Sequence, residues 1–284
     1  MSTLKELRGR IKSIRSTQKI TAAMQMVAAA KLRRTQDKVV SFRRYYQGMN
    51  DLVSRLLAQD IVTDDWPLED IHLLKGTTGP VLFLFVSTNR GLCGSYNTNL
   101  MAAVKRAVEN HSRVRFAVIG RKGFDLLPTV WKEKVLPLPA IEDFTYTTAC
   151  RLAQQLRTWM QQGEIGSIQA VHYVFKNVMS QTLQLTPLVP VTPLSGQQTP
   201  SYCLLEPGID ELLPYVLKNY LDVQLYRIFL ESSACEQAAR MTAMDHATRN
   251  ARDILQQLQL TYNQRRQAHI TNQLIEIISA AQEI

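Results

Sequence analysis

The stretch QKITAAMQMVAAAKLRR, residues 18–34, has no glycine or proline and is rich in alanine and methionine, a composition typical of an α-helix. Counting outward in heptads, apolar residues recur at three- and four-residue spacing from residue 4 to residue 56. No proline interrupts this pattern before Pro67, so it predicts a coiled-coil helix of about 55 residues, roughly 80 Å long. The sixteen positions of this seam are Leu4, Leu7, Ile11, Ile14, Gln18, Thr21, Gln25, Ala28, Leu32, Thr35, Val39, Phe42, Tyr46, Met49, Val53 and Leu56.

Three polar residues interrupt the seam within the quoted stretch. Gln18, Thr21 and Gln25 stand where the neighbouring heptads carry leucine or isoleucine. A polar residue at a seam position often fixes the register of two paired helices. We therefore expect these three side chains to specify how the helix meets its partner.

A second long helix is expected at the other end of the chain. No proline or glycine follows Pro214, which suits the first turn of a helix. Small residues and methionine dominate residues 232–251 and permit a partner helix to approach closely. The two helices can pair antiparallel if the chain between them folds as a compact insert; two unrelated helices in a bundle are the alternative. The last turns carry a further seam of Ile270, Leu274, Ile277, Ala281 and Ile284.

The middle of the chain changes to alternating strand and helix patterns. Residues 97–110 and 144–163 are expected as helices, and the prolines of the last expected strand suit the edge of a sheet. Such alternation predicts a small, mostly parallel α/β sheet. The fold class is thus an antiparallel coiled coil of the terminal helices flanking a Rossmann-like domain, with segments 1–60, 61–210 and 211–284. The expected strands are residues 80–87, 115–120, 168–177 and 182–191.

The charge of the chain is concentrated in its first helix. Of a net +9 over 284 residues, residues 1–57 alone carry +10, with thirteen Lys and Arg against three acidic residues. Such a helix favours an acidic partner: nucleic acid, anionic lipid or an acidic protein surface. Nucleic acid is disfavoured because the seam commits half of the helix surface and Tyr45 and Tyr46 do not interleave with the basic positions.

No segment predicts a membrane span or a secretory signal. The longest apolar run, Val81–Val86, is far shorter than the roughly 20 residues that a span needs, and the first residues lack an apolar signal core. We expect a cytoplasmic protein. The four cysteines and five histidines are scattered without metal-ligand spacing, so no metal or cofactor is expected.

The sequence STNRGLCGSYN, residues 87–97, lies where an α/β fold often places a ligand. Its glycines follow a GxxG spacing, which matches neither the dinucleotide nor the P-loop pattern. We expect a tight turn capped by Asn97 or Thr98 rather than a nucleotide site. Cys93 could serve as a nucleophile, but no base can be assigned to it, so catalysis in the insert is not expected.

Three longer motifs resemble the gamma subunit of F-type ATP synthases, and with their spacing they cover nearly the whole chain. TNRGLCGSYN (88–97) is similar to the "S-D-R-G-L-C-G" loop of that family. The other two lie in the terminal helices: IKSIRSTQKITAAMQMVAAAKLRRTQ (11–36), and SSACEQAARMTAMDHATRNA (232–251) followed by YNQRRQAHITNQLIEIISAAQEI (262–284).

The resemblance implies a rotor shaft that catalyses nothing by itself. In the family, the antiparallel helices turn inside a hexamer of alpha and beta subunits, and the insert lies against the epsilon subunit and the ring of c subunits. The shaft couples ion flow, of H⁺ or Na⁺, to ATP synthesis or hydrolysis at the beta subunits. The chain is then expected in single copy, peripheral to the membrane, at the cytoplasmic face of the bacterial plasma membrane. A coiled-coil scaffold unrelated to ATP synthesis, or an enzyme based on the insert, remains the alternative.

The resemblance also implies five contact and coupling residues. Arg266 and Gln267 match a pair that contacts a loop of a beta subunit, and the planar fork of an arginine suits a carboxylate there. Met24 and Arg240 match residues that face one another near the base of the shaft. Cys93 matches the cysteine of the loop that passes the lower lobes of the beta subunits.

Three residues depart from the pattern of the family. Ala22 replaces a lysine, Gln273 replaces a glutamate and Ala280 replaces a glycine. These changes indicate a divergent bacterial branch with altered contacts to its partner subunits. The cysteine-containing regulatory insert of the chloroplast type is absent, so thiol control of rotation is not expected.

Overall fold

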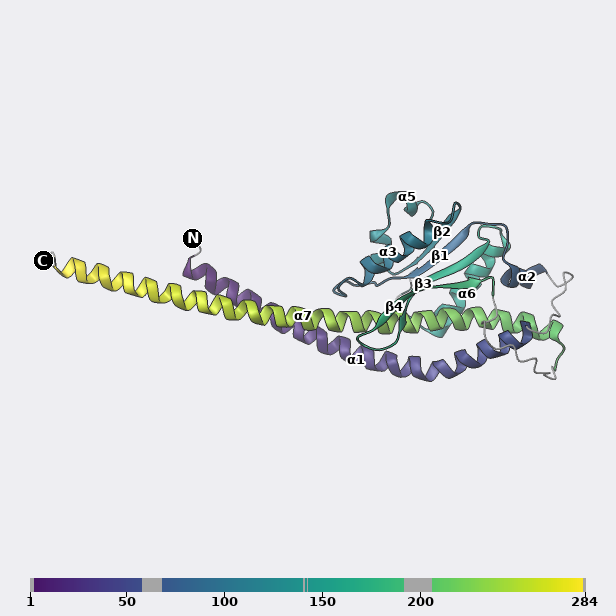
Figure 1. Cartoon of the computed structure of the whole chain (residues 1–284), viewed down its shortest axis with the longest axis horizontal. Helices are drawn as coiled ribbons and strands as arrows, with labels where there is room; N and C mark the ends of the chain where they lie inside the picture. Colours follow the sequence, from purple (N-terminus) through teal and green to yellow (C-terminus); the bar gives the residue numbers. More distant parts are fainter. Residues whose placement is uncertain (1–2, 58–67, 140, 142, 192–205, 283–284) are drawn as a thin grey trace. The chain divides into compact units, whose positions relative to one another are not determined.

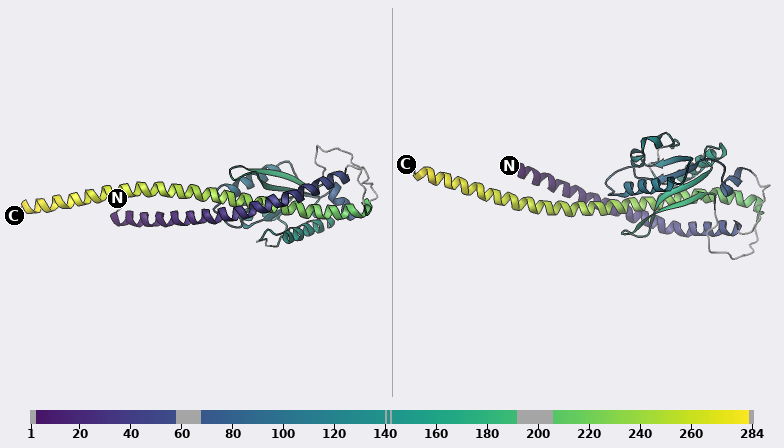
Figure 2. Two further views of the ribbon diagram at one scale, coloured as in Figure 1. Left: turned by 90° about the horizontal axis from the view of Figure 1, so that it is seen from below. Right: turned by 45° about the horizontal axis from the view of Figure 1, so that its top comes forward.

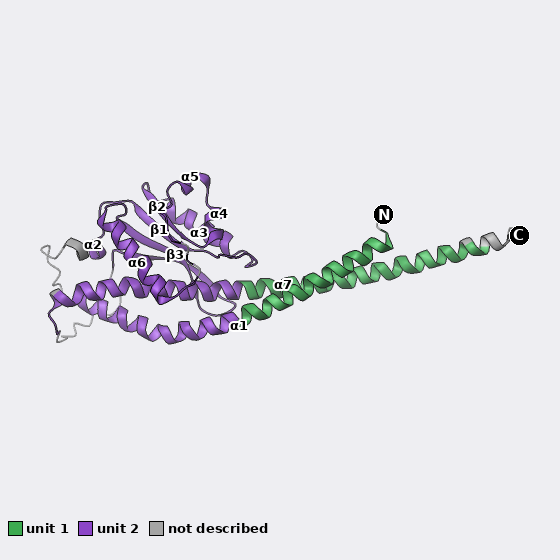
Figure 3. Cartoon of the chain, turned by 180° about the vertical axis from the view of Figure 1, so that it is seen from behind, with its two compact units in different colours: residues 1–30, 240–284 green, residues 31–239 purple. Residues whose placement is uncertain are grey.

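The computed structural model describes residues 3–57, 68–139, 141, 143–191 and 206–282. It divides into two compact units, residues 1–30 with 240–284 and residues 31–239 (Figure 3). Two long helices, α1 (Leu4–Leu57) and α7 (Ile209–Gln282), contribute to both units, and the other elements belong to the second unit. The division into segments 1–60, 61–210 and 211–284 follows the order of the chain and stays a prediction.

The seam of α1 is confirmed by its burial. All sixteen seam positions are buried or half-buried, and Leu7, Ala28, Leu32, Val53 and Leu56 are 1–3 % exposed. In both views of Figure 2, α1 and α7 lie side by side. The helix is a single run of 54 residues.

The two helices pair antiparallel. In the first unit, the α1 residues Arg8 and Gln25 bond to Tyr262 and Asp245 of α7, so the partner number falls as the α1 number rises. In the second unit, the ring of Phe42 meets the ring of Tyr226 edge-on at 4.8 Å. The predicted antiparallel pairing is confirmed within each unit.

The insert contains a four-stranded sheet in the order β2–β1–β3–β4 (Figure 1). β1 pairs in parallel with both β2 and β3, while β4 is antiparallel to β3 and forms an edge, as its prolines predict. The strands are β1 (Val81–Val86), β2 (Val114–Ile119), β3 (Ser167–Phe175) and β4 (Gln181–Val189).

The central strand β1 is buried on both faces, which explains its continuous apolar sequence. Leu82, Leu84 and Val86 of β1 join one core cluster with the helices α6 (Tyr146–Gln161) and α7 and the end of α1. The alternate residues Phe83 and Phe85 are fully buried outside that cluster. The helix α3 (Tyr96–Val108) carries its own buried residues to the sheet and makes contacts with β1, β3 and β4.

The structure differs from the predicted helices at several points. α7 begins at Ile209 and contains Pro214 in its interior, so the proline is not in the first turn. Three short helices escaped prediction because each is shorter than the window in which helical periodicity can be recognised. They are α2 (Leu68–Lys75), α4 (Arg121–Leu126) and α5 (Thr129–Lys132). Within the described residues, no helix combines the length and apolar composition needed to cross a membrane.

The second unit contains a fully buried, uncharged histidine, His172. His172 of β3 is 0 % exposed, its Nε2 lies 3.1 Å from the Thr186 hydroxyl, and its Nδ1 lies 3.2 Å from the Tyr173 carbonyl oxygen. Burial, assisted by the positive charge of Arg227, lowers the pKa of His172 to about 3. The ring is therefore neutral across the physiological range.

The stability of the second unit should consequently fall in mild acid. Below pH 6.5 the unfolded chain binds a proton on His172. The folded chain binds that proton only near its pKa of about 3, so between these two pH values acid favours the unfolded chain. We expect a loss of up to about 1.4 kcal/mol per pH unit in this window, and none above it. Urea unfolding at pH 7, 6 and 5 measures it. His172→Gln should flatten the dependence relative to the exposed control His246→Gln, and parallel slopes for both variants would contradict the prediction.

Candidate functional site

The polar part of the seam is a hydrogen-bonded contact between α1 and α7. The Thr21 hydroxyl donates to the Gln18 carbonyl oxygen at 3.1 Å and lies 2.8 Å from the Thr248 hydroxyl. Gln25 Nε2 donates to Asp245 Oδ1 at 3.1 Å, and the second carboxylate oxygen of Asp245 pairs with Arg249. These bonds place Thr21 and Gln25 opposite polar partners, as expected for residues that fix a register, whereas the role predicted for the Gln18 side chain stays a prediction.

Thr248 and Asp245 were missed by the sequence reasoning. Nothing in their local sequence separates them from the other polar residues of residues 232–251. Once the antiparallel register is known, they are the residues that face Thr21 and Gln25, so a register derived from the two seams together could have found them.

Met24 and Arg240 both belong to the first unit. Met24 lies half-buried on α1, one residue before Gln25. Arg240 is the first residue that α7 contributes to this unit, and it is only 9 % exposed although it is charged. An arginine buried to this degree is rarely without a partner, and Arg240 does interact with other groups of the protein.

Arg266 and Gln267 lie in the last part of α7, and both are exposed. Beyond Tyr262, which bonds Arg8 near the start of α1, the described residues of α7 have exposed apolar side chains. The predicted terminal seam is therefore not covered by α1. Its described members Ile270, Leu274 and Ile277 are 47–65 % exposed. The side chain of Ala281 and the whole of Ile284 lie outside the described residues.

The departures from the family pattern fall in different surroundings. Ala22 is half-buried on α1, and Gln273 is exposed on α7. The side chain of Ala280 lies outside what the structure describes.

The basic residues of α1 lie on its exposed surface. Each of its thirteen lysines and arginines is exposed, while the seam faces the rest of the protein. In the first unit this charge is carried by Lys5, Arg8, Arg10, Lys12, Arg15 and Lys19. An unneutralised row of this kind attracts an acidic surface over roughly a Debye length, about 8 Å at physiological salt.

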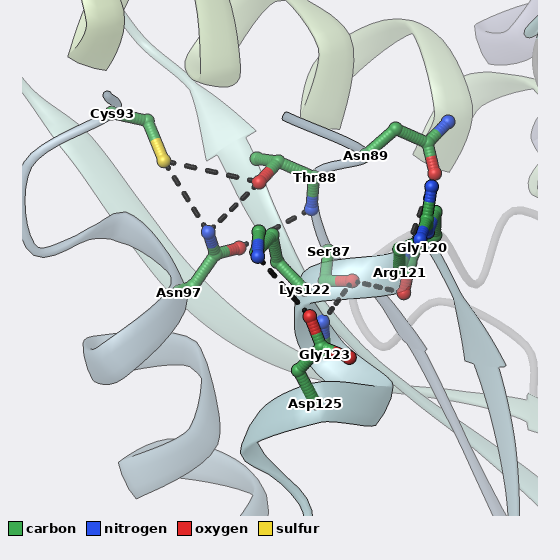
Figure 4. Close-up of polar contacts among 10 residues, drawn as sticks. All are labelled: Ser87, Thr88, Asn89, Cys93, Asn97, Gly120, Arg121, Lys122, Gly123 and Asp125. Carbon is green, nitrogen blue, oxygen red and sulfur yellow. Dashed lines mark hydrogen bonds and ion pairs between the residues drawn. The ribbon is translucent and has the colours of Figure 1, made fainter. Parts of the chain in front are cut away.

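Cys93 lies in the loop between β1 and α3, in the second unit (Figure 4). The thiol is 3 % exposed; its sulfur accepts from Asn97 Nδ2 at 3.3 Å and lies 3.9 Å from the Thr88 hydroxyl. Asn97 also bonds Thr88 twice, through the Thr88 backbone N–H and hydroxyl. The thiol is thus packed in a hydrogen-bonded cluster of Thr88, Cys93 and Asn97, and none of these contacts is with an acidic or basic side chain.

The predicted cap of α3 was wrong. The N-cap residue is Ser95, which makes no capping bond through its side chain, and Asn97 bonds back to the end of β1 instead. Leu92 has φ 65° and Gly94 φ 59°, so the loop turns back on itself through two left-handed residues. The bonds of Asn97 fasten that turned loop to the strand.

The end of β1 is fastened to β2 by Ser87, which the sequence reasoning did not single out (Figure 4). Its hydroxyl lies 2.7 Å from the Ile119 carbonyl oxygen and accepts from the Gly123 N–H at 2.8 Å. Gly120 has φ 92°, and a Cβ there would lie 2.4 Å from the Ser87 carbonyl oxygen. These contacts hold the carboxyl ends of β1 and β2 close together. Among the described residues, no group of three His, Cys, Asp or Glu side chains is placed to hold a metal ion.

Comparisons with known proteins agree on one family. The family model described as ATP synthase matches residues 3–284. The ATP synthase gamma chain of Gluconacetobacter diazotrophicus is 40 % identical and that of Geotalea daltonii 38 %; this chain is covered completely in both cases, and the relatives over 100 % and 99 % of their lengths.

Solved structures agree in fold. A chain of the central stalk and c-ring of the Tetrahymena thermophila mitochondrial ATP synthase matches 80 % of this chain and 99 % of its own length, with 26 % identity and a TM-score of 0.58. A rotor chain of the Euglena gracilis enzyme matches 94 % and 98 %, with 21 % identity and a TM-score of 0.65. The full-length sequence matches, the paired helices and the inserted sheet together show that this chain belongs to the ATP synthase gamma chain family.

Proposed function

We propose that this chain transmits torque through the antiparallel pair of α1 and α7, as the central rotor shaft of an F-type ATP synthase. It is a non-catalytic subunit of the complex, and the chemistry of ATP belongs to other subunits. The observation that carries the proposal is the hydrogen-bonded, register-fixed helix pair in a member of the gamma chain family. Two helices locked in register resist sliding past one another, which a torque-bearing element requires.

The partners are the alpha and beta subunits of the catalytic hexamer, the epsilon subunit and the c-ring. The uncovered apolar side chains at the end of α7 and the exposed basic side chains of α1 suit such surroundings. An apolar end can turn against an apolar surface of its partners without breaking hydrogen bonds or ion pairs. Long-range attraction between the basic face and an acidic partner tolerates sliding, whereas buried ion pairs would have to separate at each step.

Five residues are proposed to couple rotation to the partner subunits: Met24, Cys93, Arg240, Arg266 and Gln267. The exposure of Arg266 and Gln267 leaves both able to bond a beta subunit directly. Cys93 and Arg240 are nearly buried, so they act by shaping the loop and the helix pair that carry them. Met24, half-buried beside Gln25, packs at the edge of the polar seam.

We further propose that the chain works at the cytoplasmic face of the bacterial plasma membrane, peripheral to the bilayer and in single copy per complex.

The chain should co-purify with matching alpha and beta subunits into an active ATPase and should show no ATPase activity alone. Turnover by the isolated chain, or failure to assemble, would overturn the rotor assignment.

Gln267→Ala is expected to lower ATP synthesis several-fold while the complex still assembles, because an exposed amide contributes little to folding but can bond a partner. Synthesis by reconstituted vesicles measures the loss, and co-purification measures assembly. Gln259→Ala, an equally exposed change on the same helix, is the matched control and should leave both unchanged. Equal synthesis by the two variants would remove Gln267 from the coupling residues.

A further inference from the structure

Within the second unit, residues of α1 and α7 line a partly open cavity. Its volume is about 120 Å³, and Val39, Phe42 and Leu230 form its apolar wall. A cavity needs only about 15 Å³ to hold one water molecule, so this one has room for a small molecule or for the end of a side chain.

The polar wall of the cavity contains an arginine whose bonds are incomplete. Arg227 stacks on the ring of Tyr46, with its guanidinium carbon 4.6 Å from the ring centre. Its Nη1 lies 3.7 Å from Glu231 Oε1, which is beyond hydrogen-bonding distance. Its Nε is buried without a hydrogen-bond partner among the described residues. The contact with Tyr46 therefore leaves the Nε donor of Arg227 unsatisfied.

The remaining polar residues give the wall a positive balance. Arg43 and Arg227 line it with a single acid, Glu231, while the neighbouring His172 is neutral. Glu231 is 8 % exposed, and its Oε2 has no hydrogen-bond partner in the described protein. Burial raises the pKa of Glu231, against the opposing charges of Arg227 and Arg43. The two arginines outnumber the one acid, so the wall is positive whether or not Glu231 carries a proton.

We propose that this cavity is a binding site for a carboxylate group, held by the fork of Arg227 and attracted by Arg43. A carboxylate presents two parallel acceptors, which is the geometry that a guanidinium edge matches. An apolar occupant leaves Arg227 Nε and Glu231 Oε2 unsatisfied, and a cation is repelled by two arginines. The carboxylate comes either from a free small anion or from an acidic side chain of a neighbouring subunit.

Titration of the isolated full-length chain with sodium acetate, against sodium chloride at constant ionic strength, tests the site. The probe is the Nε–H NMR resonance of Arg227, assigned by its absence in Arg227→Lys. We expect a saturable shift with acetate, at an affinity on the order of millimolar for so small a ligand, and no saturable shift with chloride. A resonance that moves equally and without saturation in both salts means that the cavity holds only water, and overturns the proposal.

Charge variants identify the ligand class even if Arg227→Lys folds poorly. Arg43→Gln should weaken acetate binding several-fold, whereas Glu231→Gln, which keeps a donor and removes the acid, should retain it. Arg44→Gln is the matched control, because Arg44 is exposed on the same helix and does not line the cavity. Loss of binding in Glu231→Gln with none in Arg43→Gln indicates a cation site and contradicts the proposal.

The source of the carboxylate is decided in the assembled complex. A cryo-EM map that shows an acidic side chain of another subunit on Arg227 identifies a subunit contact, and separate density identifies a free anion. A cavity with neither, in which Arg227 has turned to bond Glu231, overturns the proposal. The acetate titration and the charge variants use the isolated chain and do not depend on the rotor function, so the two ideas fail separately.

Discussion

Gly120→Ala is expected to lower the free energy of unfolding by about 3–4 kcal/mol, a large effect for the addition of one methyl group. The residue has φ 92° and ψ 136°, a backbone region found almost only for glycine that costs an L-residue roughly 1–3 kcal/mol. The added Cβ would also lie 2.4 Å from the Ser87 carbonyl oxygen and 2.6 Å from its hydroxyl, so the ends of β1 and β2 must separate. Urea unfolding followed by tryptophan fluorescence measures the loss.

Two other glycines separate the causes. Gly163 has φ 73° with nothing within 4 Å of an added Cβ, so Gly163→Ala should cost only the backbone strain of roughly 1–2 kcal/mol. Gly48 lies inside α1 with open space around it, and Gly48→Ala should stabilise the protein by up to about 1 kcal/mol. If Gly120→Ala costs no more than Gly163→Ala, the close contact with Ser87 is not what requires the glycine.

Asp222→Ala is expected to destabilise the second unit by about 3 kcal/mol, because it leaves a partly buried arginine without its carboxylate. Asp222 Oδ1 accepts from Arg157 Nη1 at 3.1 Å, and the two side chains are 9 % and 17 % exposed. The remaining bond of Arg157 Nη1, to the Lys218 carbonyl oxygen, is longer at 3.4 Å. The pair joins α6 to α7, so the same unfolding measurement should report its loss.

The exposed pair of Lys122 and Asp125 provides the control. It has the same N–O distance of 3.1 Å, but its side chains are 46 % and 57 % exposed. Asp125→Ala should change stability by less than about 1 kcal/mol, since solvent screens an exposed ion pair. Similar losses in the two variants would show that burial does not decide the contribution of the Arg157–Asp222 pair.

The long helices and the sheet could be predicted because their signals are local and repeated. The seam of α1 recurs over eight heptads, so single exceptions such as Thr35 do not obscure it. The strand β1 is a run of six apolar residues, and Pro187 marks β4 as an edge. In each case the pattern follows from burial: one side of the helix α1 is buried, and both sides of the strand β1 are buried. Both patterns can be recognised within a short stretch of sequence.

The side-chain contacts could not be predicted, because their partners are distant in sequence. Asn97 suggested a helix cap from its position, but its bonds go to Thr88, which only the turned loop brings within reach. Nothing in the sequence near Arg227 predicts its contact with the ring of Tyr46, which lies on the other long helix. The family resemblance supplied five coupling residues, and their roles stay proposals that rest on the motif and on exposure.

The antiparallel pairing of α1 with α7 has a consequence for synthesis on the ribosome. Arg8 and Tyr262 are 254 positions apart, and Thr21 and Thr248 are 227 apart. At roughly 5–20 residues per second, α1 emerges about 10–50 seconds before the segment that covers its seam. During that interval an apolar stripe of several turns has no native partner and is open to aggregation. We therefore expect a holding chaperone or a temporary partner to cover the first helix of the nascent chain, so that the helix made first completes its packing last.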